Sequence, residues 1–445
     1  MQYQETQEMQ YQETQCNKQI YTKRQEKTVM EEAKKIGYRS VLKQKEYMKS
    51  TSALVVNRFG DAIDAIASTW IVYELTGNAM WSALIYGMNT LPTVLITPFA
   101  GAFVEGRNKK AIMVITDLIR ALCVAYVATG YLFGILQAWH LVLTTLIIST
   151  VEAFRTPAST AITPMILEKE YYDYGMSLSG ALSTVVELIG TGLAAGIIAV
   201  IGTSGAIYLD MATFVISAGI IATMNTREEK KAHQKFDAKE YVKTLKEGLS
   251  YSFRKKAILL LCMIALFLNG ILVPLNSLQA PFIKEVLGGG AAALSVMGVS
   301  ISLSMLAGSV LYPMIRSKVS GKALCVFCGL SIAAFYIGTV ACRPLYASEL
   351  AMYVIFAALT FLLGISAALA SAFASVEILK VVEEGYLARV GAIFAALTVA
   401  VNPIVSFLLT AVTKVMGTAA IFLIAGGLAL AATILMLANK SLNEV

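Results

Sequence analysis

Residues 81–110 read WSALIYGMNTLPTVLITPFAGAFVEGRNKK, an apolar run that ends in a short basic loop. A helix of about 20 apolar residues is long enough to cross the hydrocarbon core of a bilayer, which is roughly 30 Å thick. The same alternation of an apolar run and a short charged loop recurs along the chain from residue 52 onward. We therefore predict an all-α integral membrane protein.

The composition of the whole chain agrees with this class. Of 445 residues, 57% are hydrophobic and 15% are charged, which excludes a soluble domain because such a domain covers itself with polar groups. The net charge of +7 comes from short blocks between apolar runs, a layout typical of membrane topology and not of nucleic-acid binding. Two histidines and six scattered cysteines argue against a metal or redox site, so we expect no cofactor.

The apolar segments form two sets of six, which predicts twelve transmembrane helices in two pseudo-symmetric bundles. The first set comprises residues 52–75, 81–104, 111–133, 140–164, 175–200 and 205–224. The second set comprises residues 257–283, 291–315, 323–342, 350–376, 390–413 and 417–438. The predicted domains are a disordered polar tail with an amphipathic segment near Val29–Met48 (1–50), a first bundle (51–224), a linker with an amphipathic helix (225–256) and a second bundle (257–445).

The distribution of Lys and Arg predicts the orientation. Most of these residues fall on the tail's side of the predicted spans, and the loops of the opposite side carry Lys284, Arg343 and Lys414. Because positive loops stay on the cytosolic side, both termini and the linker are predicted to be cytosolic. The expected location is a bacterial cytoplasmic membrane.

The two halves also repeat a pattern. A glycine and then a basic loop follow the second span, from Gly101 to Lys110, and again the eighth, from Gly308 to Lys318. Repeated six-helix halves are typical of alternating-access carriers. From about Ser52 to Asn439 the chain resembles the major facilitator superfamily, whose signature after the second helix is a glycine, an acid and a basic turn.

A narrower resemblance is to the bacterial macrolide-efflux and enterobactin-exporter branch of that superfamily. The strings that carry it are Gly60-Asp61, WIVYELTG (70–77), DLIR (117–120), Pro157-Ala158 and Asp210. The fifth span departs from the drug/proton antiporters of the superfamily, because it lacks their Gly-Pro pair. The resemblance implies a transporter, not an enzyme, that exports bulky amphiphilic compounds of the drug or macrolide type in exchange for protons.

Charged residues inside the spans are the candidates for proton coupling, since each costs roughly 2.5–3.5 kcal/mol on insertion scales. Arg58, Asp61 and Asp64 follow one another at spacings of three and so project from a similar face of the first helix. Asp61 either pairs with Arg58 or carries a proton. Asp64, near the middle of the span, and Glu187, alone in the fifth span, complete the predicted proton-coupling set with Asp61.

The fourth span holds Glu152 and Arg155, three residues apart. Arg155 either neutralises Glu152 or meets an anionic group of the substrate, and Glu187 reaches Arg120 or Arg155 across the bundle if it does not titrate. The residues predicted to line the substrate cavity are Arg155, Glu152, Tyr73, Phe154, Asn269 and Asn402.

The resemblance also implies a cytosolic latch. Asp117 and Arg120 lie beside the Gly101 loop and are expected to tie neighbouring helices together there. The predicted latch comprises Gly101, Glu105, Lys109, Lys110, Asp117, Arg120 and Arg389. Pro274, Pro281 and Pro403 are expected to kink or break helices where gates hinge.

No phosphate-binding loop is present in the sequence, so an ion gradient is the expected energy source. The expected partners are a small amphiphilic substrate, protons and the lipid bilayer, without nucleic acid, and the protein is expected to be a monomer. Two alternatives stay open at this point. One is export or flipping of an endogenous metabolite such as a siderophore or lysophospholipid, and the other is a membrane sensor or scaffold without transport.

Overall fold

The computed structural model describes residues 38–105, 107–226, 255–382 and 387–438. These residues form helices and the turns between them, with no strand among them. The amphipathic helix predicted in the linker and most of the predicted polar tail lie outside the described residues. The all-helical class predicted from the apolar runs is confirmed for the part of the chain that the structure describes.

The first half contains six helices and one short 3-10 turn. Their bounds are α2 (Tyr38–Val41), α3 (Lys45–Thr76), α4 (Ala79–Glu105), α5 (Lys109–Leu132), α6 (Ala138–Ile166), the 3-10 turn η1 (Lys169–Tyr171) and α7 (Tyr172–Ala222). The long α7 contains both the fifth and the sixth predicted spans. Gly202 separates them, because its backbone is not helical (φ 75°, ψ 169°) and a positive φ favours glycine.

The second half repeats this arrangement with a break in its first helix. Its elements are α9 (Lys256–Ser277), α10 (Gln279–Phe282), the π-helical turn η2 (Ile283–Leu287), α11 (Ala291–Arg316), α12 (Gly321–Ala341), the 3-10 turn η3 (Arg343–Ala347), α13 (Glu349–Val381), α14 (Leu387–Val412) and α15 (Thr418–Ala438). The chain bends by 63° between α9 and the helical segment from Gln279 to Leu287.

Eight of the described helices are long and apolar enough to cross a membrane, or nine if the bent pair counts as one span. The helix α3 is not among them, and it carries Arg58, Asp61 and Asp64 within two turns. Each of the predicted apolar segments lies in helical structure, although the fifth and sixth share α7 and the seventh, 257–283, is divided between α9, α10 and the start of η2. Large apolar side chains such as Leu122 and Leu435 are about 70% exposed on the outside of the bundle, where lipid would cover them.

The boundary predicted at residue 50 is wrong, because it falls inside α3. This helix begins at Lys45, and Tyr47 in its first turn is buried, as is Val41 in α2. Residues 42–44 separate α2 from α3, so the continuous amphipathic segment expected up to Met48 is also wrong in its described part. The end of the predicted tail therefore packs as part of the first half.

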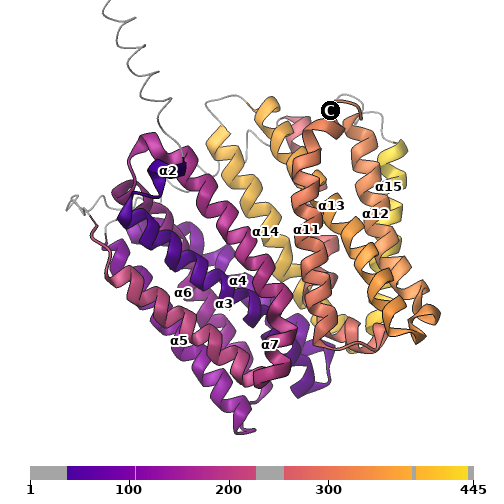
Figure 1. Ribbon diagram of the computed structural model, residues 1–445. Helices are drawn as coiled ribbons and strands as arrows, with labels where there is room; N and C mark the ends of the chain where they lie inside the picture. The colour runs from indigo at the N-terminus through magenta and orange to yellow at the C-terminus, as the bar shows by residue number, and fades with distance from the viewer. Residues whose placement is uncertain (1–37, 106, 227–254, 383–386, 439–445) are drawn as a thin grey trace, which may run out of the picture.

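The two halves lie side by side, with the first half in indigo to magenta and the second in orange to yellow (Figure 1). Helix α4 packs against α14, and α7 packs against α11. We call the end at which α3 begins, at Lys45, the tail side of the bundle. The opposite end, where α3 stops at Thr76, is the far side.

Hydrogen bonds that join the two halves lie toward the far side. Tyr73, near the end of α3, donates to Glu285 Oε1 of η2 at 2.9 Å. Ser295, near the start of α11, accepts from the Ala195 backbone N–H at 3.2 Å. The third such bond joins the Ser406 hydroxyl of α14 to a backbone carbonyl near the start of α4. The far side is thus the end at which the halves are bonded to each other.

Candidate substrate cavity and ion-pair network

A cavity of about 340 Å³ lies among α3, α4, α5, α6, α7 and α9. The first half supplies most of its wall, and the second half contributes Asn276 and Ser277 from α9. Three carboxylates (Asp61, Asp64 and Glu152) and one guanidinium (Arg120) line it. The apolar part of the wall comprises Ala65, Val72, Ile85, Val124, Val127, Leu141, Ile148 and Ile207, and hydroxyl residues such as Ser68, Thr69 and Thr144 line it as well. The lining therefore combines apolar surface with an excess of acidic groups.

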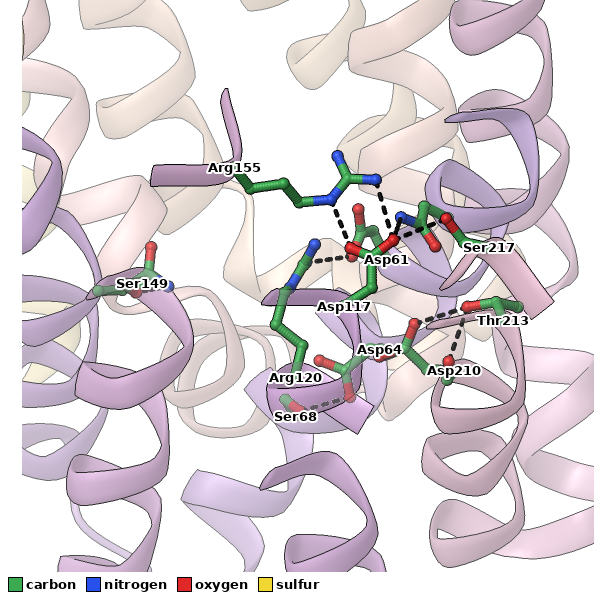
Figure 2. Close-up of polar contacts among 12 residues, drawn as sticks. Asp61, Asp64, Ser68, Asp117, Arg120, Ser149, Arg155, Asp210, Thr213 and Ser217 are labelled. Carbon is green, nitrogen blue, oxygen red and sulfur yellow. Dashed lines mark hydrogen bonds and ion pairs between the residues drawn. The ribbon is translucent and has the colours of Figure 1, made fainter. Parts of the chain in front are cut away.

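Asp61 pairs with an arginine of another helix. Arg120 of α5 donates from its guanidinium to Asp61 Oδ1 at 2.8 Å (Figure 2). The plane of Phe214 packs under the same guanidinium, with 4.1 Å between the guanidinium carbon and the ring centroid. Arg58 is exposed and makes no ion pair with a described residue. The alternative in which Arg58 pairs with Asp61 is therefore wrong.

Asp117 lies at the centre of a second network, in which four helices meet. It is fully buried, and the Arg155 guanidinium of α6 donates to both of its carboxylate oxygens, the longer contact being 3.3 Å. The Ser217 hydroxyl of α7 donates to Asp117 at 2.7 Å, and the Asn57 amide of α3 donates at 3.3 Å (Figure 2). A buried carboxylate needs this degree of pairing to offset the loss of its hydration.

Asp64 and Asp210 form an acidic pair with hydroxyl partners. Ser68 donates to Asp64 at 2.8 Å, and Thr213 donates to Asp210 at 3.2 Å. Figure 2 draws the two carboxyl groups near each other, and they interact electrostatically. Neither carboxylate makes an ion pair with a described residue within 4.0 Å. Asp210 is 1% exposed, whereas Asp64 lines the cavity.

A glycine allows α3 to approach Asp210 closely. A Cβ atom at Gly60 would lie 2.3 Å from Asp210 Oδ1 and 2.1 Å from the Thr213 hydroxyl oxygen. No real Cβ atom tolerates such distances, so any other residue at position 60 would displace the Asp210 and Thr213 side chains or α3 itself. This close approach is a physical reason for the glycine in the Gly60-Asp61 string.

Glu152 is exposed to the cavity, and Arg155 does not neutralise it. Nearby amides complete the polar lining. Asn89 donates to the Ser149 hydroxyl at 3.0 Å, and Tyr86 of α4 and Asn276 of α9 line the cavity from the two halves. The cavity wall thus presents a carboxylate, amides and a phenol in addition to the Asp61–Arg120 pair.

Four residues predicted in the cavity lie elsewhere. Tyr73 is hydrogen bonded to Glu285 on the far side, where the two halves are joined. Phe154 packs edge-on against Phe103, with 5.2 Å between ring centroids. Asn269 donates to a carbonyl of its own helix, Ala265, at 2.9 Å. Asn402 is half-buried in α14 and does not line the cavity.

Arg155 and Glu187 also depart from their predicted places. Arg155 is 9% exposed and held by Asp117, so it does not line the cavity. Glu187 is exposed on α7, outside the cavity lining, and it pairs with neither Arg120 nor Arg155. Of the predicted proton-coupling set, the structure brings Asp61 and Asp64 together and leaves Glu187 apart.

Three residues of the predicted latch, Gly101, Glu105 and Arg389, have no described contacts. Lys110 donates to the backbone carbonyl of Met224 at 2.7 Å, just after the end of α7. Lys109 is half-buried at the start of α5. Asp117 bonds to α3, α6 and α7, and Arg120 bonds to Asp61 of α3, so each of these two latch residues joins α5 to other helices of the first half. Their part in a cytosolic latch stays a prediction.

Several residues of the site are not predictable from the sequence alone. Asp210 was noted only as part of a resemblance, and its place beside Asp64 follows from the packing of α7 on α3. Tyr86, Asn89 and Ser68 carry no signal in the sequence beyond being polar residues of an apolar span. Among the described residues, no group of three or more His, Cys, Asp and Glu side chains is arranged to hold a metal ion.

Comparisons with known proteins agree with this architecture. The profile of the transmembrane secretion effector family matches residues 40–445. Macrolide efflux protein A of Streptococcus pyogenes is 23% identical over 256 residues, covering 58% of this chain and 63% of that protein, which is less than two thirds of its length. The multidrug efflux pump Tap of Mycolicibacterium fortuitum is 24% identical over 229 residues, covering 50% of this chain and 56% of that protein.

Solved structures share the fold at low sequence identity. The nucleoside transporter NupG superposes with a TM-score of 0.70 at 13% identity, covering 88% of this chain and 98% of that one. A bacterial homologue of the iron transporter ferroportin in an inward-facing state gives a TM-score of 0.66 at 14% identity, covering 88% and 98%. The chain therefore belongs to the transmembrane secretion effector family of major facilitator transporters, and it is a multi-pass membrane protein.

Proposed function

We propose that this protein exports bulky amphiphilic compounds, of the drug or macrolide type, across a bacterial cytoplasmic membrane in exchange for protons. The macrolide and multidrug efflux pumps among its relatives support this class of substrate. A cavity wall that combines apolar side chains with hydroxyl, amide and charged groups supports it as well, because the apolar side chains can bind the body of an amphiphile while the polar ones orient its polar end.

The observation that carries the proposal is the environment of Asp64. Its carboxyl group lines the cavity beside Asp61, and its hydrogen-bond partner is a hydroxyl and not a cation. An ionised carboxylate in such a place costs free energy, and binding a proton removes that cost. Asp61 differs, because Arg120 compensates its charge. We assign proton binding to Asp64, with Asp210 behind it.

The arrangement of the halves supports alternating access. They are hydrogen bonded to each other toward the far side, through Tyr73–Glu285 and Ala195–Ser295. If the tail side is cytosolic, this conformation admits substrate from the cytosol, and release requires that the far-side bonds break while the tail side closes. Rocking of two repeated halves about a central site is the general mechanism of such folds.

The charge of the cavity favours a cationic or neutral amphiphile. Glu152 and Asp64 are carboxylates of the lining without an ion pair to a described residue, and Arg120 is already engaged by Asp61. Export of an anionic metabolite would need a free cation in the cavity, and Arg155, the residue expected to supply it, is held by Asp117 outside the lining. The alternative of an anionic substrate therefore finds no support in the geometry.

The test is transport by the full-length protein in everted membrane vesicles with an imposed pH gradient. A fluorescent cationic amphiphile serves as substrate, and a macrolide serves as competitor. We expect Asp64→Asn to abolish accumulation driven by the gradient while exchange of substrate between the two sides persists, because the neutral amide cannot carry a proton. Gradient-driven accumulation by Asp64→Asn at the wild-type rate would remove Asp64 from the mechanism.

Glu187→Gln is the matched control, since it also neutralises a membrane carboxylate but one that is exposed outside the cavity. We expect it to transport as wild type does. If wild-type protein shows no gradient-dependent transport of any of these amphiphiles, the proposed export function is wrong. That result would favour the alternative of a membrane sensor or scaffold without transport.

A further inference from the structure

A second cavity, of about 130 Å³, lies inside the second half, between α9, α12, α13 and α15. Most of its lining is apolar, with small residues prominent on α13 and α15. Larger apolar side chains, among them Leu268, Leu272 and Ile332, form the rest of the wall. Ser371, one of its lining residues, is exposed, so the cavity is not sealed within the bundle.

This cavity occupies the place that the Asp117 network occupies in the first half. Helices α5 and α12 are the third helices of their halves, and both begin with the same cap. Asn108 accepts from the N–H three residues on, at 2.6 Å, and Ser320 does so at 3.3 Å. Asp117 comes nine residues after the first cap, and Gly329 comes nine residues after the second. The two positions are therefore equivalent.

Their neighbours on the last helix of each half correspond as well. Asp117 receives a hydrogen bond from Ser217 of α7, while a Cβ atom at Gly329 would lie 2.1 Å from the Thr433 hydroxyl oxygen of α15. In both halves this position on the third helix thus faces a hydroxyl residue of the last helix. The aspartate side chain of the first half has no counterpart at Gly329, where Thr433 packs directly against the backbone instead.

The fourth helices show the same replacement. Arg155 lies 17 residues after the start of α6 at Ala138, and Ser366 lies 17 residues after the start of α13 at Glu349. An arginine and an aspartate of the first half are therefore replaced by a serine and a glycine in the second. Gly329 lines the cavity and Ser366 does not, so the apolar space lies beside the positions that the ion pair holds in the first half.

Helix α9 lines both this cavity and the substrate cavity. Leu272 lines the apolar cavity, and Asn276 lines the acidic one. These residues are four apart, so they lie on the same face of the helix with a rise of about 6 Å between them. One molecule that follows this face of α9 can therefore contact both cavities.

We propose that the cavity between α9, α12, α13 and α15 is the subsite for an apolar group of the transported amphiphile. The group is an aromatic ring or a short branched alkyl chain, and the basic end of the same molecule lies beside Glu152 and Asp64. This inference rests on the proposed function and adds the shape of the substrate, an apolar group joined to a basic end. The volume supports it, because a dry cavity of roughly this size lined by aliphatic side chains binds a molecule as large as benzene.

The test is photolabelling of the full-length protein in lipid nanodiscs with trifluoromethyl phenyl diazirine, an apolar probe with one ring. We expect saturable labelling of α12 and α15 at residues that line the cavity, located by mass spectrometry. Tetraphenylphosphonium, a cation with aromatic rings, should suppress this labelling. Tetramethylammonium, a cation of equal charge without an apolar group, should not.

Two variants close the cavity from different helices. Ala432→Phe on α15 and Ala370→Leu on α13 fill it, and each should lose the saturable labelling. Ala431→Phe is the matched control, since Ala431 is exposed and precedes a lining residue by one position. Labelling in this control should remain. Using two filling variants guards against the failure of one of them to fold, which size-exclusion chromatography detects.

Labelling that does not saturate, or that persists equally in both filling variants, would overturn the subsite. Saturable labelling that tetraphenylphosphonium leaves unchanged would overturn it too, because the cavity would then be separate from the cation site. Failure of the proposed function looks different. It appears as the absence of gradient-driven transport in vesicles, which the photolabelling does not require.

Discussion

The side-chain hydroxyl of Tyr336 on α12 donates a hydrogen bond to the backbone carbonyl of Ile271 on α9, with 2.6 Å between the two oxygen atoms. The same hydroxyl accepts from the backbone N–H of Leu275 at 3.3 Å. These backbone groups are four residues apart, so the hydroxyl bridges one step of the helix, next to Pro274. A side chain at such a step and a proline are both recognised causes of kinks, and the 63° bend follows within one turn.

Replacing Tyr336 by Phe tests this bridge. The ring and its edge-on contact with Phe422 remain, but the Leu275 N–H loses a partner in a fully buried place. An unsatisfied buried group costs about 1–3 kcal/mol, so we expect a lower thermal unfolding temperature in nanodiscs. Tyr126→Phe is the control, because Tyr126 is half exposed. Equal unfolding temperatures for the two variants would contradict the structural role of the bridge.

The sequence predicts the helices of this fold well and the partners of their polar residues poorly. An apolar run of membrane length is visible in consecutive residues, and each predicted run lies in helical structure. Pro274 was expected at a kink, and it lies beside one. The residue that bridges the kink is Tyr336, about 60 positions away, and nothing in the sequence near either residue links them. The spacing of residues along one helix does not predict contacts between helices that are far apart in the sequence.

The charged residues show the same limit in another form. Spacing of three along a helix pairs Arg58 with Asp61 and Glu152 with Arg155, since only neighbours on one helix are visible in a sequence. In the structure Asp61 bonds to Arg120 and Arg155 bonds to a carboxylate of α5. Each arginine pairs with a carboxylate of another helix, which the spacing along its own helix does not reveal.

The buried pair of Asp117 and Arg155 yields a prediction for stability. Removing one partner leaves the other charge buried, which typically costs about 3–5 kcal/mol, so Asp117→Asn and Arg155→Met should each lower the free energy of unfolding strongly. The double variant should lose clearly less than the sum of the two, because neither charge then remains unpaired. Chemical unfolding of the four proteins measures the cycle, and additive losses would show that the two side chains do not interact.

Glu46 precedes the span predicted from residue 52. We expect its contacts to make the stability of the tail side depend on pH. The N–H of Asn225 donates to its carboxylate at 2.6 Å, and Lys49 contacts it at 2.9 Å. These contacts, the backbone hydrogen bond first, lower the pKa of Glu46 below its ordinary value. A carboxyl whose pKa is lowered by folding stabilises the folded state above its unfolded pKa, and this contribution is lost as the pH falls through the lower, folded value.

The measurement is hydrogen exchange at the Asn225 amide between neutral and acidic pH. Protection should be high at neutral pH and should fall in acid as Glu46 takes up a proton and ceases to be a charged acceptor. In Glu46→Gln the protection should be weaker at neutral pH and nearly independent of pH. A wild-type amide whose protection does not change with pH would show that the carboxylate is not what holds the start of the linker.

Substitution by alanine is expected to have opposite effects on thermal stability at two glycines of the first half. A Cβ atom at Gly60 would overlap Asp210 and Thr213, so Gly60→Ala must displace these two side chains or α3 itself and disturb the cavity carboxylates nearby. At Gly196 of α7 nothing lies within 4 Å of the Cβ position, so Gly196→Ala meets open space and gains the better helix propensity of alanine, worth about 1 kcal/mol. Thermal unfolding should therefore fall for Gly60→Ala and stay equal or rise for Gly196→Ala, with transport lost in the first alone. A Gly60→Ala protein as stable and active as wild type would mean that the close approach of α3 to Asp210 is not required.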